Sequence, residues 1–331
     1  MKKIAFLMLG ITLGCTAQEK AAPKLVAEND AFYNYLDENA EIEVLAEGFT
    51  WSEGPVWIKE GGYLLFSDVP KNTIFKWKEG EGISEFLKPS GYTGVLPYSR
   101  EPGSNGLTIN NNGELVACEH GDRRITRMPL VGGGKFTLAD TWQGKRFNSP
   151  NDVVQASNGT YYFTDPPYGL PKQQDSEIRE IDAFGVYKIG TDGSVEMVIS
   201  NLNRPNGVAL SPDEKTLYVA QSDFNAPYIM AYNIQDDGSV DEGKVFFDAK
   251  TVLKPDLRGL PDGLKVAKDG TIFSTGPGGV LVITSEGKYL GRIETGQPTA
   301  NCAWGDDGSV LYMTANNTLM RVQTKTVGDG F

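Results

Sequence analysis

Short apolar runs separated by glycine-containing turns repeat along the chain from about residue 41 onward. In each repeat, a polar residue precedes an apolar run, a Gly turn follows, and a second run rich in β-branched and aromatic residues comes next, as in 158–165 (NGTYYFTD) and 269–275 (DGTIFST). A third run often follows, as at 185–189 and 279–283. Runs of this length and composition are typical of β-strands. The pattern predicts an all-β protein built from repeated four-stranded antiparallel units.

Six such units fit between residues 41 and 325. Each unit begins with an oxygen-bearing side chain directly before its first strand, and we call these side chains the lead residues. They recur 39–56 residues apart and are Glu53, Asn105, Asn151, Asn206, Asp262 and Asn301. Four-stranded units at this spacing are typical of propeller blades. We therefore predict a six-bladed β-propeller with a central channel over residues 41–325, followed by a C-terminal tail at 326–331.

The last unit has room for only three strands, since it ends near Val322. A strand-like segment at residues 40–46 precedes the first unit. We expect this segment to supply the missing outer strand of the sixth blade, which closes the ring and covers an exposed sheet edge.

The N-terminal residues have the pattern of an export leader. Residues 1–14 carry Lys2 and Lys3 before an apolar stretch that is too short to span a membrane, and Cys15 follows directly. The junction resembles a bacterial lipoprotein processing site. We predict a signal peptide at 1–14, a lipid on Cys15 and a tether over 15–40, with secretion without a lipid as the alternative. The protein would then be exported to the periplasm and contact the membrane only through that lipid.

Charge and cysteine content narrow the possible partners. The formal net charge of −12 argues against nucleic acid and anionic membrane surfaces, and it is compatible with binding a cation. Cys118 and Cys302 lie far apart in separate apolar runs and form no disulfide framework. We expect both to be free buried thiols.

The chemistry of the lead residues points to a metal site. The first strand of every propeller blade lines the central axis, so the six lead side chains are expected to converge at one mouth of the channel. All of them offer oxygen, which favours Ca²⁺ or Mg²⁺, and the mixture of amides with carboxylates favours Ca²⁺. The alternative is that Asn and Asp before Gly only form turns. Repetition in register, together with Glu53, which has no special turn role, favours a site.

Several motifs together resemble the gluconolactonase branch of the senescence-marker-protein (regucalcin-like) family. They cover nearly the whole chain after residue 45 and lie at 53–57 (EGPVW), 65–68 (LFSD), 118–124 (CEHGDRR), 148–154 (NSPNDVV), 163–169 (FTDPPYG) and 261–264 (PDGL). The resemblance implies a six-bladed propeller with one catalytic divalent cation in the channel, usually Ca²⁺, with Mg²⁺, Mn²⁺ or Zn²⁺ as alternatives. The ligands it implies are Glu53, Asn151, Asn206 and Asp262. It also implies that Asn105 contacts the substrate and that Asp262 is the general base or nucleophile.

Together these features predict an enzyme that hydrolyses a sugar lactone, an aldonolactone such as glucono-1,5-lactone, to the open acid. A lactone is a cyclic ester, so Ca²⁺ would polarise its carbonyl while Asp262 assists the attack of water. Two alternatives stay open. One is a metal-dependent esterase or phosphotriesterase on the same scaffold, and the other is a propeller that binds a ligand without catalysis.

The remaining polar candidates each have a structural alternative. The chain has no Gly-x-Ser-x-Gly motif, and a Ser-His-Asp triad would depend on His120, the only histidine. We expect His120 to be either a structural residue or a substrate contact and proton shuttle. Arg123 and Arg124 are expected at the channel rim, where Arg123 would contact substrate, or on the solvated surface. Three further residues, expected at the channel entrance or in rigid turns, are Asp165, Tyr168 and Asp223.

Overall fold

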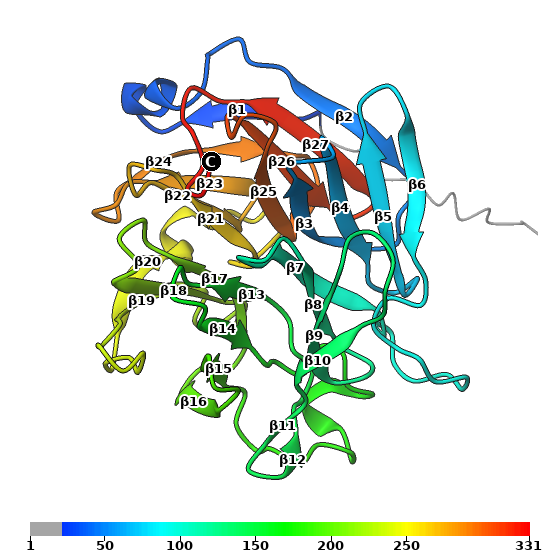
Figure 1. Ribbon diagram of the computed structural model, residues 1–331. Coiled ribbons are helices and arrows are strands. Elements are labelled where there is room, and N and C mark those ends of the chain that lie inside the picture. The colour runs from blue at the N-terminus through cyan, green and yellow to red at the C-terminus, as the bar shows by residue number, and fades with distance from the viewer. Residues whose placement is uncertain (1–21) are drawn as a thin grey trace, which may run out of the picture.

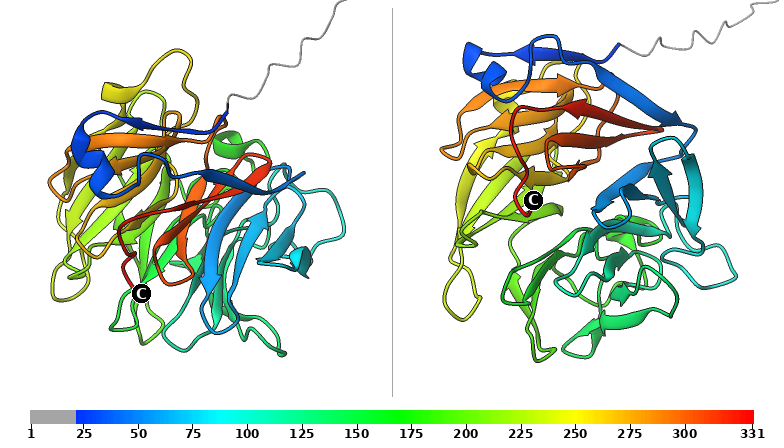
Figure 2. Two further views of the ribbon diagram at one scale, coloured as in Figure 1. Left: turned by 90° about the horizontal axis from the view of Figure 1, so that it is seen from above. Right: turned by 45° about the horizontal axis from the view of Figure 1, so that its top comes forward.

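A computed structural model describes residues 22–331 of the chain. Six antiparallel sheets are arranged around a common axis (Figures 1 and 2). Blade one consists of β3 (Ser52–Ile58), β4 (Tyr63–Asp68), β5 (Thr73–Lys78) and β6 (Gly82–Leu87). Blade two consists of β7 (Ser104–Ile109), β8 (Leu115–Glu119), β9 (Arg124–Met128) and β10 (Phe136–Ala139). Blade three consists of β13 (Val153–Gln155), β14 (Tyr161–Thr164), β15 (Val186–Ile189) and β16 (Val195–Ile199).

Blades four to six complete the ring. Blade four consists of β17 (Pro205–Leu210), β18 (Thr216–Gln221), β19 (Tyr228–Asn233) and β20 (Lys244–Asp248). Blade five contains β21 (Leu264–Val266), β22 (Ile272–Gly276), β23 (Gly279–Ile283) and β24 (Tyr289–Glu294). Blade six contains β25 (Asn301–Gly305), β26 (Val310–Ala315) and β27 (Thr318–Gln323). Outside the blades lie the hairpin β11 (Thr141–Trp142) and β12 (Lys145–Arg146) and the 3₁₀ turns η2 (Gln173–Asp175) and η3 (Ala249–Val252). The predicted six-bladed propeller is confirmed.

The innermost strand of each blade contacts the innermost strands of both neighbouring blades. These contacts run in the closed order β3, β7, β13, β17, β21, β25 and back to β3, and Figure 1 places the same strands around the middle of the ring. Apolar clusters fill the spaces between neighbouring blades, with one cluster for each interface in the described part of the chain. Between blades one and six, for example, Trp57 stacks on Tyr312 with 5.4 Å between ring centroids. Burial between the sheets therefore holds the inner strands in fixed positions.

The ring closes through a strand from the N-terminal side, as the sequence predicts. Strand β2 (Ile42–Glu47) pairs antiparallel with β27 and becomes the outer strand of blade six.

At the other end of the chain, residues 327–331 turn back toward the middle of the ring (Figure 1). Asp329 N donates to Val266 O over 2.9 Å, at the end of β21 away from Asp262. The C-terminal segment therefore packs at the end of the inner strands opposite the lead residues.

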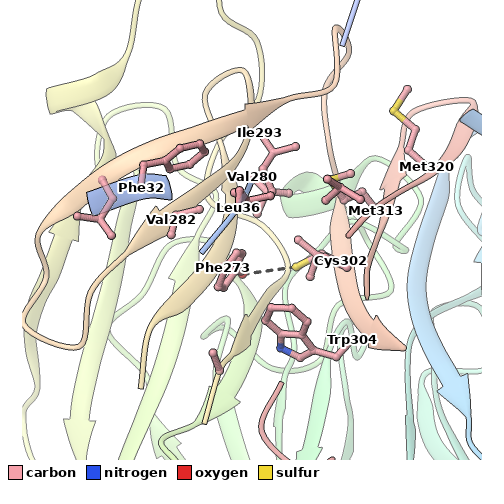
Figure 3. Packing of buried hydrophobic residues seen from close by; sticks show 14 of the residues in the cluster. Phe32, Leu36, Phe273, Val280, Val282, Ile293, Cys302, Trp304, Met313 and Met320 are labelled. Carbon is pink, nitrogen blue, oxygen red and sulfur yellow. Dashed lines mark hydrogen bonds between the residues drawn. The ribbon is translucent and has the colours of Figure 1, made fainter. Parts of the chain in front are cut away.

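The segment before β2 differs from the expected tether. Strand β1 (Lys24–Ala27) pairs with β24 as a fifth strand of blade five, and the 3₁₀ turn η1 (Asp30–Asn34) follows. Phe32 and Leu36 are fully buried against blades five and six (Figure 3). Burial removes these two apolar side chains from water, which stabilises the packed segment relative to a solvated tether. The predicted signal peptide at 1–14 and the lipid on Cys15 lie outside the described residues.

Both cysteines within residues 22–331 are buried and free, as expected. Cys302 Sγ donates to Phe273 O over 3.4 Å between blades six and five (Figure 3). Over the same range of residues, no helix has the length and apolar character needed to cross a membrane.

Candidate functional site

Five of the six lead residues line one cavity of about 670 Å³. The cavity lies where the inner strands begin, and its lead residues are Glu53, Asn105, Asn151, Asn206 and Asp262. They come from five different blades, which bring positions over a span of 210 residues to one place. The convergence predicted from the repeat is therefore present for these five residues.

β-Bulges in three of the inner strands orient lead side chains toward the cavity. The pairing register shifts between Glu53 and Val56 in blade one, between Ser104 and Leu107 in blade two, and between Pro205 and Val208 in blade four. A β-bulge of this kind turns a side chain out of the regular alternation of the strand. In three blades the lead residue lies in or beside the bulge, so the break in regular pairing positions it at the cavity.

A glycine follows the lead residue in four blades because the next blade approaches too closely for a side chain. Gly106 N donates to Asn151 O over 2.7 Å, and Gly207 N donates to Asp262 O over 3.1 Å. A Cβ on Gly207 would lie 2.1 Å from Asp262 O, and one on Gly54 would lie 2.0 Å from Asn105 O. The backbones of neighbouring blades are thus locked together beside the cavity, and the lead residues share one rigid frame.

The sixth lead residue, Asn301, does not line the cavity. Its Oδ1 accepts Cys302 N over 2.9 Å, and its side chain fills the space beside Gly263. The expectation that all six lead residues converge is therefore wrong for Asn301, whose amide caps its own strand.

In this cavity wall Glu53 is buried and Asp262 is half-buried with a buried Oδ1, and neither carboxylate has an ion-pair partner among residues 22–331. Burial is the largest cause that raises the pKa of Glu53, the hydrogen bond from Gly54 N opposes it, and the nearby Asp152 and Glu101 add to it, so that the pKa is about 8. Burial also raises the pKa of Asp262 well above its usual range, and Glu53 is the largest charged contributor. Two buried anions that repel each other favour a positive charge between them.

The donor set of this cavity fits a hard cation such as Ca²⁺. Asp262 Oδ1 is buried and has no hydrogen-bond partner. Asn206 Nδ2 donates to Ser222 Oγ over 3.0 Å, which leaves its amide oxygen available. No group of three or more His, Cys, Asp or Glu side chains in the described chain is placed to hold a metal. A cation here would therefore depend on the amides of Asn151 and Asn206 in addition to the two carboxylates.

Asp152 and Glu101 are two acidic residues at this site that the sequence reasoning missed. Asp152 occupies the position where four other blades have glycine, and it accepts Val153 N over 3.0 Å and Val208 N over 3.3 Å beneath the cavity. The break in the repeated lead-Gly pair was a usable signal for Asp152. Glu101 lines the cavity from the loop before β7, outside the repeat.

The Pro-Pro loop places its two polar residues differently. Tyr168 lines the cavity, where the guanidinium of Arg204 lies 5.4 Å from its ring centroid. Asp165 is buried away from the cavity and accepts the backbone N–H groups of Asn148 and Ser149, both over 2.7 Å. Asp165 therefore fixes the turn that leads into Asn151. Asp223 also lines the cavity, at the end of blade four's second strand.

Arg123 is neither at the channel rim nor on the surface, so both expectations for it are wrong. It has φ +57° and a buried side chain. Its guanidinium donates to the backbone carbonyls of Phe147 over 2.6 Å, Ile178 over 3.1 Å and Arg146 over 3.3 Å. These bonds connect blade two to the loops of blade three. Arg124 is half-buried and bonds Glu119 and Asp122 instead of a substrate.

His120 is fully buried and does not line the cavity wall. Its Nδ1 lies 3.1 Å from Glu101 O, and because a carbonyl oxygen only accepts, Nδ1 carries the proton. Its Nε2 has no partner. Burial lowers the pKa of His120 to about 4, so the ring is neutral at pH 7.

The buried neutral His120 predicts acid-sensitive stability. Its folded pKa of about 4 lies below the ordinary 6.5, so the unfolded chain takes up the proton first as the pH falls. The free energy of unfolding should be unaffected by His120 above pH 6.5 and should lose about 2 kcal/mol by pH 5. The variant His120→Asn keeps a donor for Glu101 O and should lack this loss. Urea unfolding of both proteins at pH 7 and pH 5 measures the difference, and an equal pH dependence in both would contradict the prediction.

Comparison with known proteins agrees with the fold. Residues 51–317 match the family described as SMP-30/Gluconolactonase/LRE-like region. The chain is 40% identical over 326 residues to a gluconolactonase of Zymomonas mobilis, with 97% of this chain and 89% of the relative covered. It is 25% identical to the pentonolactonase XacC of Haloferax volcanii, over 79% of this chain and 80% of the relative.

A solved gluconolactonase from Xanthomonas campestris superimposes with a TM-score of 0.78 at 31% identity, covering 93% of this chain and 99% of that structure. The family match spans all six lead residues and every strand from β3 to β26. The chain therefore belongs to the SMP-30/Gluconolactonase/LRE-like family.

Proposed function

We propose that this protein is a Ca²⁺-dependent lactonase that hydrolyses an aldonolactone, with glucono-1,5-lactone as the first substrate to test, to the open aldonic acid. The main support is the convergence of five oxygen-bearing lead residues on one cavity in a chain 40% identical to a protein named gluconolactonase. Two relatives, the gluconolactonase of Zymomonas mobilis and the pentonolactonase XacC of Haloferax volcanii, are named as enzymes that act on sugar lactones. Their names support this substrate class.

The residues that would hold the cation are Glu53, Asn151, Asn206 and Asp262. Their oxygens line the cavity, and the two carboxylates supply the negative charge that a divalent cation requires. A bound Ca²⁺ would act as a Lewis acid toward the lactone carbonyl.

The protein's own groups have separate tasks in the proposed reaction. Asp262 has an unpartnered Oδ1 in the cavity wall, which suits it to accept a proton from the attacking water. Asn105 lines the same cavity and offers both a donor and an acceptor to a substrate hydroxyl or to the ring oxygen. The glycine contacts between blades keep Asp262 and Asn105 in place, so little reorganisation is needed during turnover.

Removal of divalent cations provides the direct test. Treatment with EDTA followed by desalting should lower the enzymatic rate of acid release from glucono-1,5-lactone by at least about 100-fold, because the lactone carbonyl then lacks the Lewis acid that polarises it. Added Ca²⁺ should restore the rate. Acid release is followed with a pH indicator after subtraction of spontaneous hydrolysis, and metal content is measured on the same samples. Full activity in metal-free protein would overturn the calcium dependence, and faster turnover of an organophosphate than of any lactone would favour the phosphotriesterase alternative.

A further inference from the structure

Glu101 contributes a carboxylate to the cavity from outside the repeated lead positions. It is half-buried, lines the same cavity as Asn105 and Asp262, and lies close enough to raise the pKa of both Glu53 and Asp262. Within residues 22–331 its carboxylate accepts no hydrogen bond, and Arg100 is the only charged group that lowers its pKa. Burial raises that pKa to about 7, which reflects poor hydration of the carboxylate. Glu101 therefore has acceptor capacity that neither the protein nor bulk water fully satisfies.

The backbone around Glu101 is held by the turn that contains His120. His120 Nδ1 donates to Glu101 O over 3.1 Å, and His120 N donates to Gly103 O over 3.2 Å. Gly121 N donates to Pro102 O over 3.0 Å. Three consecutive carbonyls, those of residues 101–103, are thus bound by His120 and Gly121. The same turn packs tightly on the other side, since a Cβ on Gly169 would lie 2.4 Å from His120 Cβ.

We propose that Glu101 is a specificity-determining residue whose carboxylate accepts hydrogen bonds from the hydroxyl groups of a polyhydroxylated lactone, and that His120 is a positioning residue that acts through Glu101. This inference rests on the proposed lactonase function and refines it. A carboxylate accepts strongly from hydroxyls but gains nothing from a methylene group. The cavity should therefore discriminate between a sugar lactone and a plain cyclic ester of the same ring size.

The family resemblance suggested His120 itself as a substrate contact, and the geometry assigns it a different task. His120 has no exposed surface and no place in the cavity wall, whereas the residue it bonds has both. Because His120 is buried and Glu101 faces the cavity, segment 118–124 would act on the substrate only through the hydrogen bond from His120 Nδ1 to Glu101 O.

The test compares two lactones in steady-state kinetics of the full-length, Ca²⁺-loaded enzyme. Glucono-1,5-lactone carries ring hydroxyls, and δ-valerolactone has the same six-membered ring without them. Glu101→Gln should lower kcat/KM for glucono-1,5-lactone by about 10- to 100-fold and change that for δ-valerolactone by less than about threefold, since a site built to bond a hydroxyl loses only that interaction. Calcium affinity, measured by titration calorimetry, should fall only about tenfold or less, because Glu101 adds negative charge near Glu53 and Asp262 without being one of the proposed ligands, and the kinetics are therefore measured at saturating Ca²⁺.

The His120 variants separate positioning from general structural support. His120→Leu should raise KM for glucono-1,5-lactone more than for δ-valerolactone, and His120→Asn, which keeps a donor near Glu101 O, should restore much of the loss. An equal loss on both lactones in Glu101→Gln would overturn the specificity role. An equal loss in His120→Leu and His120→Asn would overturn the positioning role. A wild-type protein inactive on both lactones would refute the proposed function and this inference with it.

Discussion

Replacing Asp262 with Asn is expected to lower kcat on glucono-1,5-lactone by about a thousand-fold. The amide keeps the size of the side chain and one oxygen, but it does not take a proton from water. Asp262 Oδ1 has no protein partner, so no existing hydrogen bond to the carboxylate's free oxygen is lost. The expected loss is therefore in the chemical step.

The same substitution should leave the fold intact. The pKa of Asp262 is raised well above its ordinary value by burial and by Glu53, which means that the charged form is destabilised in the metal-free protein. Since Asn carries no charge, the free energy of unfolding in EDTA at pH 7 should equal or exceed that of the wild type. Urea unfolding in EDTA and steady-state kinetics in Ca²⁺ measure the two effects separately.

Asp223→Asn is the matched control for Asp262→Asn. Asp223 lines the same cavity, but its carboxylate is engaged by Asn203 Nδ2 over 2.7 Å and by Asn225 N over 2.9 Å. Its removal should change kcat by less than about tenfold. If Asp262→Asn kept the wild-type kcat with Ca²⁺ still bound, the role of Asp262 as proton acceptor would be wrong.

The repeat made most of the fold predictable. Each lead residue precedes an apolar strand at blade spacing, and this regularity predicts the number of blades, the inner strands and six converging residues, five of which line the cavity. Closure by β2 followed from the missing fourth strand of blade six. These features recur at a regular spacing along the chain, and a regular spacing can be recognised in a single sequence.

Features outside the period were not predictable in the same way. Glu101 reaches the cavity from a loop whose path depends on contacts with the turn at His120, and those contacts join blade two to its own preceding loop. The sequence suggests that Arg123 is exposed because it is charged. It is buried instead, since its guanidinium donates hydrogen bonds to three backbone carbonyls of segments that lie farther along the chain. Phe32 lies in a polar stretch and finds an apolar surface only once blades five and six exist.

Gly54→Ala is expected to destabilise the protein by about 2–3 kcal/mol more than Gly62→Ala. Both glycines have φ in the left-handed region, +49° for Gly54 and +59° for Gly62, so alanine meets the same backbone strain at each. Around Gly62 nothing lies within 4 Å of an added Cβ, whereas at Gly54 that atom would lie 2.0 Å from Asn105 O. Urea unfolding in EDTA measures the difference between the two variants without a contribution from bound cation.

The extra cost at Gly54 should appear in function as well, because Gly54 directly follows the lead residue Glu53 and the atom that it would meet belongs to the lead residue Asn105. Relieving it requires β3 to move away from β7, which displaces Glu53 relative to Asn105. A shift of about 1 Å at a catalytic site lowers turnover by about 100-fold, so Gly54→Ala should lose both calcium affinity and lactonase activity while Gly62→Ala keeps them. Equal stability and equal activity in the two variants would mean that the contact between blades one and two does not hold the site in place.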